Sequence, residues 1–117
     1  MVTAELALAL PTLVVVVAFG AFAVSVATAR IRCIDTAAAV ARMVARGEPT
    51  DAVLAREHAL GRASEVVVRR DDGLVRVDVS ARVPFLGGSL PLPTATVAAT
   101  ITVADEVSPL GGLGAPP

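Results

Sequence analysis

The chain has 117 residues, of which 55% are hydrophobic, and its ten basic residues nearly balance eleven acidic ones, for a formal net charge of −1. A chain this apolar is not a disordered tail, and its length fits a single ordinary domain. The balanced charge argues against a nucleic-acid-binding protein, which needs a basic surface to replace the counterions of phosphates. One cysteine, one histidine and no tyrosine or tryptophan exclude a disulfide framework, a structural zinc site and an aromatic base-stacking surface.

The first predicted element is a long apolar helix at the N-terminus. No charged residue occurs between Glu5 and Arg30, which leaves 24 consecutive uncharged residues, 6–29. As an α-helix this run extends roughly 36 Å at about 1.5 Å per residue, enough to cross the hydrocarbon core of a bilayer, which is about 30 Å thick. We predict that residues 1–29 form the membrane-spanning half of the helix.

Pro11 is the one residue in this run that opposes a helix. It removes a backbone donor and frees a carbonyl near Ala7, so we expect a kink in the first turns. The hydroxyl of Thr12 is a candidate to compensate that carbonyl.

The helical pattern continues past the uncharged run, so that one helix over about 2–46 leaves the membrane without a break. Gly47 and the following Pro49 then stop it. A second helix is expected over about 51–60, capped by Thr50 or Asp51 and closed by Gly61. The stripe that should face the rest of the fold consists of Ile31, Ile34, Ala38, Ala41 and Ala45.

From Ser64 the hydrophobic pattern has a period of two, which predicts strands at about 65–70, 74–83 and 94–104. Asp71-Asp72-Gly73 is predicted to be a hairpin turn. Segment 84–93, with three prolines, is a loop, and 108–117 is expected to be a disordered tail.

These elements define an α+β fold. The part beyond Gly47 holds only about sixty residues, for which a core is marginal by itself. Its valine-rich sheet face therefore needs the distal half of the long helix as a partner. We expect a small head, 30–107, in which a short helix and a three-stranded antiparallel sheet cover that half of the helix.

Two stretches of the sequence resemble a known family. They are the start of the chain, Met-Val-Thr-Ala-Glu-Leu-Ala-Leu-Ala-Leu-Pro, and residues 32–42, Arg-Cys-Ile-Asp-Thr-Ala-Ala-Ala-Val-Ala-Arg. Both stretches are similar to actinobacterial TadE-like minor pilins of the tight-adherence (Tad/Flp) type IV pilus. The resemblance covers roughly the first 46 residues, and the head beyond them carries no specific motif.

The resemblance implies a structural subunit, inserted in the membrane with an extracytoplasmic head and assembled into, or priming, an adhesive pilus at the cell surface. It also implies that residues 1–29 form the filament-core half of the helix after assembly. The implied partners are the membrane, other pilin subunits, a prepilin peptidase and the assembly machinery. In the family this peptidase cuts after a glycine just before the mature first residue, here Met1, and Glu5 matches the family's fifth-position glutamate. The chain as given is then either the processed form or one in which Met1 is the initiator.

The residues give Glu5 a physical role of their own. A carboxylate carried to the centre of a bilayer costs about 2.5 to 3.5 kcal/mol, so it needs a partner. The N-terminal ammonium of a neighbouring subunit would neutralise it in a bundle of parallel helices and set the axial register. The alternative is a solvated Glu5 at the headgroups.

Four other residues with reactive or ionisable side chains have structural explanations. Cys33 is expected to be a small buried side chain rather than an intermolecular disulfide, and His58 a surface residue rather than a metal ligand or catalyst. Asp71 and Asp72 are explained by the turn rather than by an acid pair. No nucleophile and base, phosphate loop or metal-ligand spacing is present, so we expect neither an enzyme, nor a cofactor, nor a small-molecule substrate.

The 84–93 loop is unusually apolar. It either folds back as a lid on the core or forms contacts with neighbouring subunits, because large exposed apolar patches mark partners. The residues concerned are Phe85, Leu86, Leu90 and Leu92.

Two other functions remain open. Ala27-Thr28-Ala29 fits a signal-peptidase site, and cleavage there would release a soluble binding module starting at Arg30. Alternatively, the protein is a single-pass membrane protein that does not polymerise.

The arginines just after the uncharged run bear on the orientation of the head. Arg30 and Arg32 favour a cytoplasmic head by the positive-inside rule, opposite to the pilin arrangement.

Overall fold

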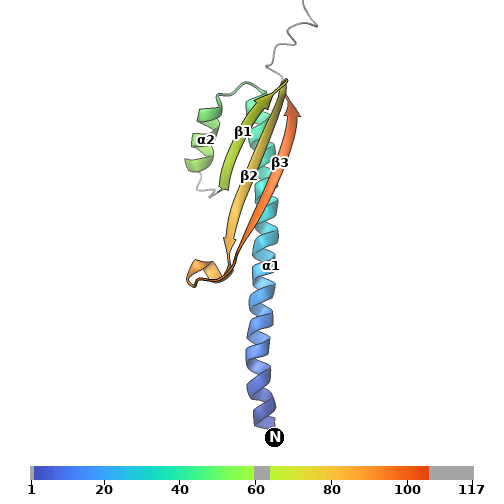
Figure 1. Cartoon of the computed structure of the whole chain (residues 1–117), viewed down its shortest axis with the longest axis vertical. Helices are drawn as coiled ribbons and strands as arrows, with labels where there is room; N and C mark the ends of the chain where they lie inside the picture. The colour runs from blue at the N-terminus through green and yellow to red at the C-terminus, as the bar shows by residue number, and fades with distance from the viewer. Residues whose placement is uncertain (1, 60–63, 106–117) are drawn as a thin grey trace, which may run out of the picture.

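The computed structural model describes residues 2–59 and 64–105, and within them the chain forms two α-helices and one three-stranded antiparallel sheet (Figure 1). The strands lie in the order β1-β2-β3. The elements are α1 (Val2–Ala45), α2 (Thr50–Ala59), β1 (Ser64–Asp71), β2 (Leu74–Pro84), the 3₁₀ turn η1 (Phe85–Gly88) and β3 (Thr94–Ala104). The predicted α+β class is confirmed. The predictions for Met1, for Gly61 and for 108–117 lie outside the described residues.

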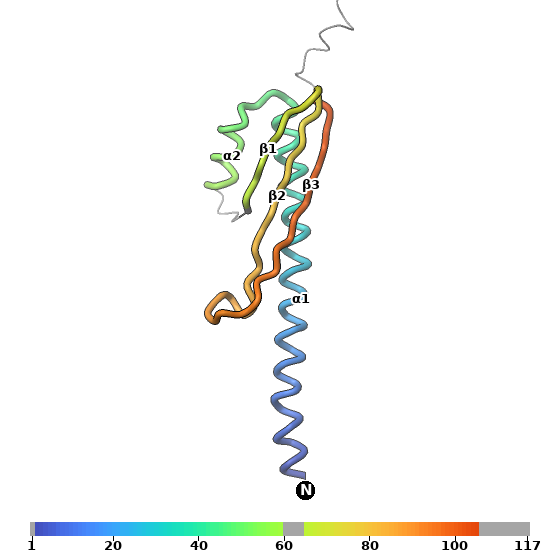
Figure 2. The backbone as a smooth tube through the Cα atoms, in the orientation of Figure 1, coloured from blue at the N-terminus to red at the C-terminus, as the bar shows by residue number. Residues whose placement is uncertain are grey.

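Helix α1 is a single helix of 44 residues, about 66 Å long at about 1.5 Å per residue. Pro11 lies inside this helix, and the backbone tube shows α1 as one continuous helix (Figure 2). The hydroxyl of Thr12 donates a hydrogen bond of 2.8 Å to the carbonyl of Leu8, not to that of Ala7. The kink expected at Pro11 stays a prediction.

The C-terminal end of α1 is fixed by a glycine cap and by the sheet. Gly47 has a φ of 92°, which glycine adopts without steric cost. Its N–H donates to the carbonyl of Val44, and the N–H of Glu48 donates to that of Met43, which together form a Schellman cap. The guanidinium of Arg70, on β1, also donates to the Val44 carbonyl at 3.2 Å. This cation at the negative end of the helix dipole joins the sheet to the helix.

The three strands form two hairpins. The first turn places Asp72 and Gly73 at φ values of 48° and 75°, with Asp71 paired to Leu74. Two consecutive residues with positive φ define the two-residue turn that matches the twist of antiparallel strands. The predicted role of Asp71-Asp72-Gly73 as a hairpin turn is confirmed.

The core lies between the sheet and the distal half of α1. Val75, Val77 and Val79 of β2 are at most 1% exposed, and each fully buried valine contributes about 1.5 kcal/mol or more. Val97 of β3 and Val53 of α2 complete this core. The alternation of dry and wet positions predicted for β2 and β3 is confirmed.

The face of α1 that packs on the sheet matches the predicted stripe in part. Ala41 and Ala45 are buried and Ala38 is half-buried, as predicted, whereas Ile31 and Ile34 are 60% and 45% exposed. The other buried residues of the helix are Cys33, Thr36, Ala37, Val40 and Val44. The prediction was wrong for the two isoleucines because apolar residues also occupy the neighbouring face of the helix, so the sequence alone does not choose between the two faces.

Candidate assembly and membrane surface

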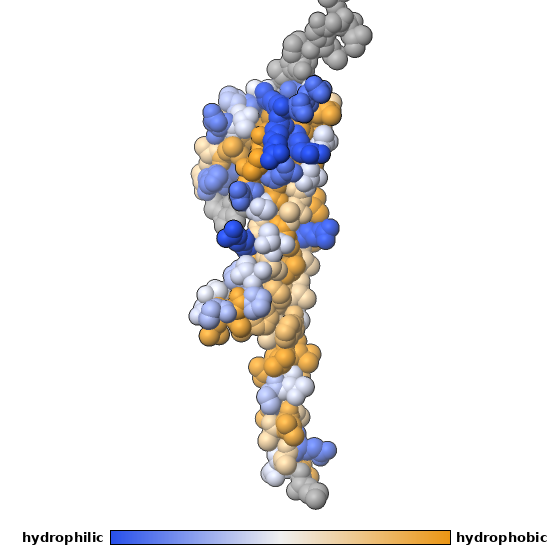
Figure 3. Space-filling view, viewed as in Figure 1, coloured by the Kyte–Doolittle hydropathy of each residue, from blue (hydrophilic) through white to orange (hydrophobic). Residues whose placement is uncertain are grey.

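The N-terminal half of α1 extends away from the head and is covered by nothing over most of its length (Figure 1). The exposed fractions of its large apolar side chains between Val2 and Val17 range from 53% at Val15 to 75% at Val2. A soluble monomer rarely leaves so much contiguous apolar surface in water. In the space-filling view, hydrophilic side chains gather on the head, and apolar side chains dominate the helix below it (Figure 3).

This helix is long and apolar enough to cross a membrane: its most apolar stretch has a mean hydropathy of 2.5 and none of it is buried in the protein. The hydroxyl groups of the uncharged segment 6–29 form hydrogen bonds within the helix. Ser25 and Thr28 donate to the carbonyls of Ala21 and Val24, four residues earlier, at 2.9 Å each. The segment therefore brings few unsatisfied hydrogen-bonding groups into an apolar environment.

Glu5 lies in the first turn of α1 and is exposed. A carboxylate at this end of a helix is favoured by the helix dipole. Within residues 2–59 and 64–105 the structure places no ion pair on its carboxylate. Met1, the other residue expected to act in assembly, lies outside the described part of the chain.

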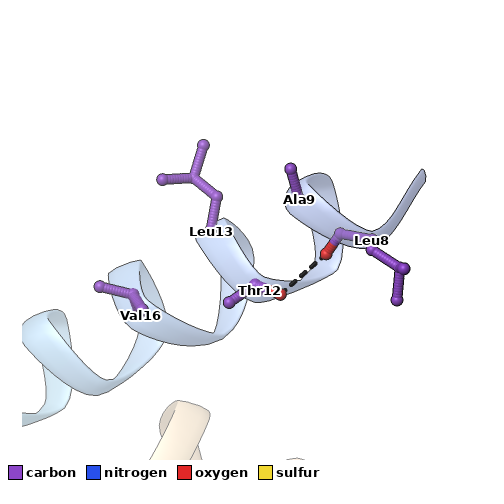
Figure 4. Close-up of a pocket in the computed structure, with 5 residues that line it drawn as sticks. All are labelled: Leu8, Ala9, Thr12, Leu13 and Val16. Atoms are coloured by element: carbon purple, nitrogen blue, oxygen red, sulfur yellow. Dashed lines mark hydrogen bonds between the residues drawn. The ribbon is translucent and has the colours of Figure 1, made fainter. Parts of the chain in front are cut away.

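One shallow depression lies on the exposed half of α1 (Figure 4). All of the side chains that line it belong to this one helix, so it is an open strip and not an enclosed cavity. Apart from the self-bonded hydroxyl of Thr12 they are apolar, which suits an acyl chain or the side of another helix. The lining residues are Leu8, Ala9, Thr12, Leu13 and Val16.

The loop after β2 reaches down to this half of the helix. The ring of Phe85 lies 5.4 Å from that of Phe19 and 5.0 Å from that of Phe22, measured between centroids. The tilted and edge-on geometries are those that aromatic pairs prefer. The chain has three phenylalanines, and all of them meet at this point.

The residues of this loop differ in exposure, and the two roles predicted for them, a lid on the core or contacts with neighbouring subunits, stay predictions. Phe85 is half-buried on α1, whereas Leu86 and Leu90 are each 55% exposed and Leu92 is 39% exposed. Sequence reasoning missed that Phe19 and Phe22 receive Phe85. Their spacing of three residues, which puts two rings on one side of a helix, was the available signal.

The remaining candidates have structural explanations. Cys33 is 0% exposed, in the core between α1 and the sheet. His58 is exposed on α2, and its Nδ1 lies 2.9 Å from the Leu54 carbonyl one turn earlier. Among the described residues no group of three or more histidine, cysteine or acidic side chains is placed to hold a metal ion.

Comparison with protein-family models, with curated proteins and with solved structures gave no match to this chain.

Proposed function

We propose that the protein is a membrane-anchored structural subunit, a minor pilin of the tight-adherence type with its head on the extracytoplasmic side. It is inserted in the membrane by α1 and assembled into, or primes, an adhesive pilus through the same helix. The first 46 residues support this proposal by their resemblance to TadE-like pilins. The fold supports it by the division of one continuous helix into a covered half and an uncovered half.

The observation that carries the proposal is the bare apolar surface between Val2 and Val17. This apolar surface is unfavourable in water and needs to be covered. In the proposed mechanism acyl chains cover it before assembly, and parallel helices of other subunits cover it afterwards. Both environments accept a helix that is apolar all round and satisfies its own backbone.

Glu5 would then provide the register between subunits. It is exposed at the start of a bare apolar helix, so burial among other helices requires a positive partner. In the proposed mechanism the N-terminal ammonium of an adjacent subunit pairs with this carboxylate. The pair forms only when the helices are staggered by the correct axial step.

The signal-peptide alternative conflicts with the packing around the candidate cleavage site. Helix α1 runs through residues 27–29 unbroken, and Val26 and Ala29 pack against the core cluster. Cleavage after Ala29 would also remove the rings of Phe19 and Phe22 that contact Phe85. These contacts favour a helix that stays part of the folded protein.

The test replaces Glu5 in cells that express the protein from its own locus. We expect Glu5→Gln, which keeps the side-chain shape and removes the charge, to reduce the protein in the sheared pilus fraction at least about tenfold, the effect of losing about 1.4 kcal/mol per contact. Its amount in the membrane fraction should be unchanged, because the span itself remains intact.

Glu65→Gln is the matched control, since Glu65 is an exposed carboxylate on β1, outside α1. It should leave both fractions at wild-type levels. Equal pilus fractions for the Glu5 variant and the control would contradict the proposal and leave a membrane protein that does not polymerise.

A further inference from the structure

We infer that the loop from Phe85 to Leu92 is a second membrane contact, which inserts into the leaflet nearer the head, beside the end of the α1 span. This inference rests on the membrane-insertion part of the proposed function and is independent of polymerisation. The loop is proposed to contact the outer part of the acyl chains, just below the headgroups.

The loop lies along α1 at the depth of the head-side leaflet. The 24 uncharged residues exceed the roughly 20 that cross a bilayer core of about 30 Å. A span of about 20 residues can start just after Glu5, or it can end just before Arg30. In either case Phe22 lies about 5 to 12 Å inside the head-side boundary of the hydrocarbon core, at about 1.5 Å per residue. The ring of Phe85 is 5.0 Å from that of Phe22, so this part of the loop is held at the same level.

The loop and its flanks are uncharged and poor in backbone donors. The sequence carries no charge between Arg82 and Asp105, and Pro91 within the loop and Pro84 and Pro93 on either side of it lack backbone N–H donors that would need water. The leucines that remain uncovered belong to the side chains that partition best into a bilayer boundary. They are continuous with the bare apolar surface of α1 through the cluster of Phe19, Phe22 and Phe85.

The backbone of the loop is strained at one of its exposed leucines. Leu86 has a φ of 52°, a left-handed conformation that is unfavourable for a residue other than glycine. The fold maintains this strain while leaving the Leu86 side chain 55% exposed. The loop is closed by hydrogen bonds from the N–H of Phe85 to the carbonyl of Pro93 and from the N–H of Leu92 to that of Leu90. A strained, closed loop that presents leucines to solvent suits an environment that is not water.

The test uses single tryptophans, because the chain contains none. The full-length protein is reconstituted into phosphatidylcholine and phosphatidylglycerol vesicles, with or without bromine on the acyl chains, and the loss of tryptophan emission is measured. Leu90→Trp reports on the loop, and Leu92→Trp repeats the measurement if the first variant disturbs the fold. Val16→Trp reports on insertion of α1.

Leu74→Trp is the matched control in the head. Leu74 is 48% exposed, similar to Leu90, but lies at the opposite end of β2 from the loop, about 33 Å away along the strand. We expect brominated lipid to quench Leu90→Trp nearly as strongly as Val16→Trp and to leave Leu74→Trp unchanged.

The outcomes separate the two proposals. If Val16→Trp is quenched and Leu90→Trp behaves like Leu74→Trp, the loop contact is wrong while membrane insertion stands. Blue-shifted but unquenched emission from Leu90→Trp would also overturn the inference, because protein rather than lipid would then cover the loop. If Val16→Trp is not quenched, both the insertion and the loop contact fail.

Discussion

The two halves of α1 have similar apolar composition and opposite surroundings. In the distal half, Val40 and Val44 are 0% exposed beneath the sheet, whereas Val16 and Val17 in the N-terminal half are both 62% exposed. The same residue type in the same helix is thus core in one half and uncovered surface in the other. The comparison shows that the identity of these residues does not determine their role; what covers them does.

The head supplies most of that cover where β2 and β3 lie against the helix, and Val53 of α2 and Phe85 cover smaller parts of it. Charged residues follow the same division, because between Glu5 and Arg30 the helix has none, and beyond Arg30 its uncovered side carries charged residues including Asp35 and Arg42. The exposed part of the distal half is therefore suited to water, and the N-terminal half is not.

The two halves should differ most in how the same substitution, valine to alanine, changes the free energy of unfolding of the head. Val40→Ala should destabilise the head by about 2 kcal/mol, because it leaves a cavity in the core. Val16→Ala should change the free energy of unfolding of the head by less than about 0.5 kcal/mol. Hydrogen exchange of the β2 amides in detergent micelles measures both. Equal losses for the two variants would mean that the N-terminal half is also packed against the head.

The junction of helix and sheet gives a smaller effect. Arg70→Ala removes the hydrogen bond to the Val44 carbonyl and an ion pair to Asp105, whose Oδ2 lies 3.8 Å from the arginine Nε. Arg70 is 46% exposed, so solvent weakens the pair, and we expect a loss of about 1 kcal/mol in the same exchange experiment.

Arg69→Ala is the control for this substitution. Arg69 is exposed, and it lies opposite Arg76 in the register of β1 and β2. Removing one of two like charges that face each other across strands should be neutral within about 0.5 kcal/mol. If Arg69→Ala destabilises the head as much as Arg70→Ala, the helix-end contact of Arg70 has no particular importance.

The smallest effect is expected for Gly20→Ala. A Cβ built on Gly20 meets no atom within 4 Å, so the added methyl group has room in the isolated chain. The head should keep its stability, and exchange in this part of the helix should slow slightly, because alanine favours a helix by about 0.5 to 1 kcal/mol over glycine. A destabilised head would show that this region makes contacts within the folded chain.

Much of the fold was predictable from periodicity and from turn residues. Alternating valines located β2, and Asp72-Gly73 and Gly47 located the turn and the helix end, because each requires a backbone conformation that few residues adopt. The packing face of α1 was predictable only in part: Ala41 and Ala45 are buried as predicted, but Ile31 and Ile34, which are as apolar as the residues that pack on the sheet, are exposed. In that helix the small side chains of Ala37 and Ala41 let the sheet approach closely, a preference of shape rather than of hydrophobicity.

The candidate site was predictable only in part. The bare span and the position of Glu5 follow from where charges are absent, which a sequence displays directly. The contact of Phe85 with Phe19 and Phe22 joins positions more than sixty residues apart. It depends on the register of β2 against the helix, which no local pattern specifies.

The central claim is that the uncovered half of α1 belongs to the working protein, where lipid and then other helices cover it. The most direct test is the N-terminal sequence and intact mass of the protein from the membrane and sheared pilus fractions of cells expressing it from its own locus. The account predicts that the protein in both fractions retains Glu5 and the whole uncharged segment 6–29. A mature protein that begins at Arg30 would contradict it, because the apolar half would then be a discarded signal peptide and the head a secreted module.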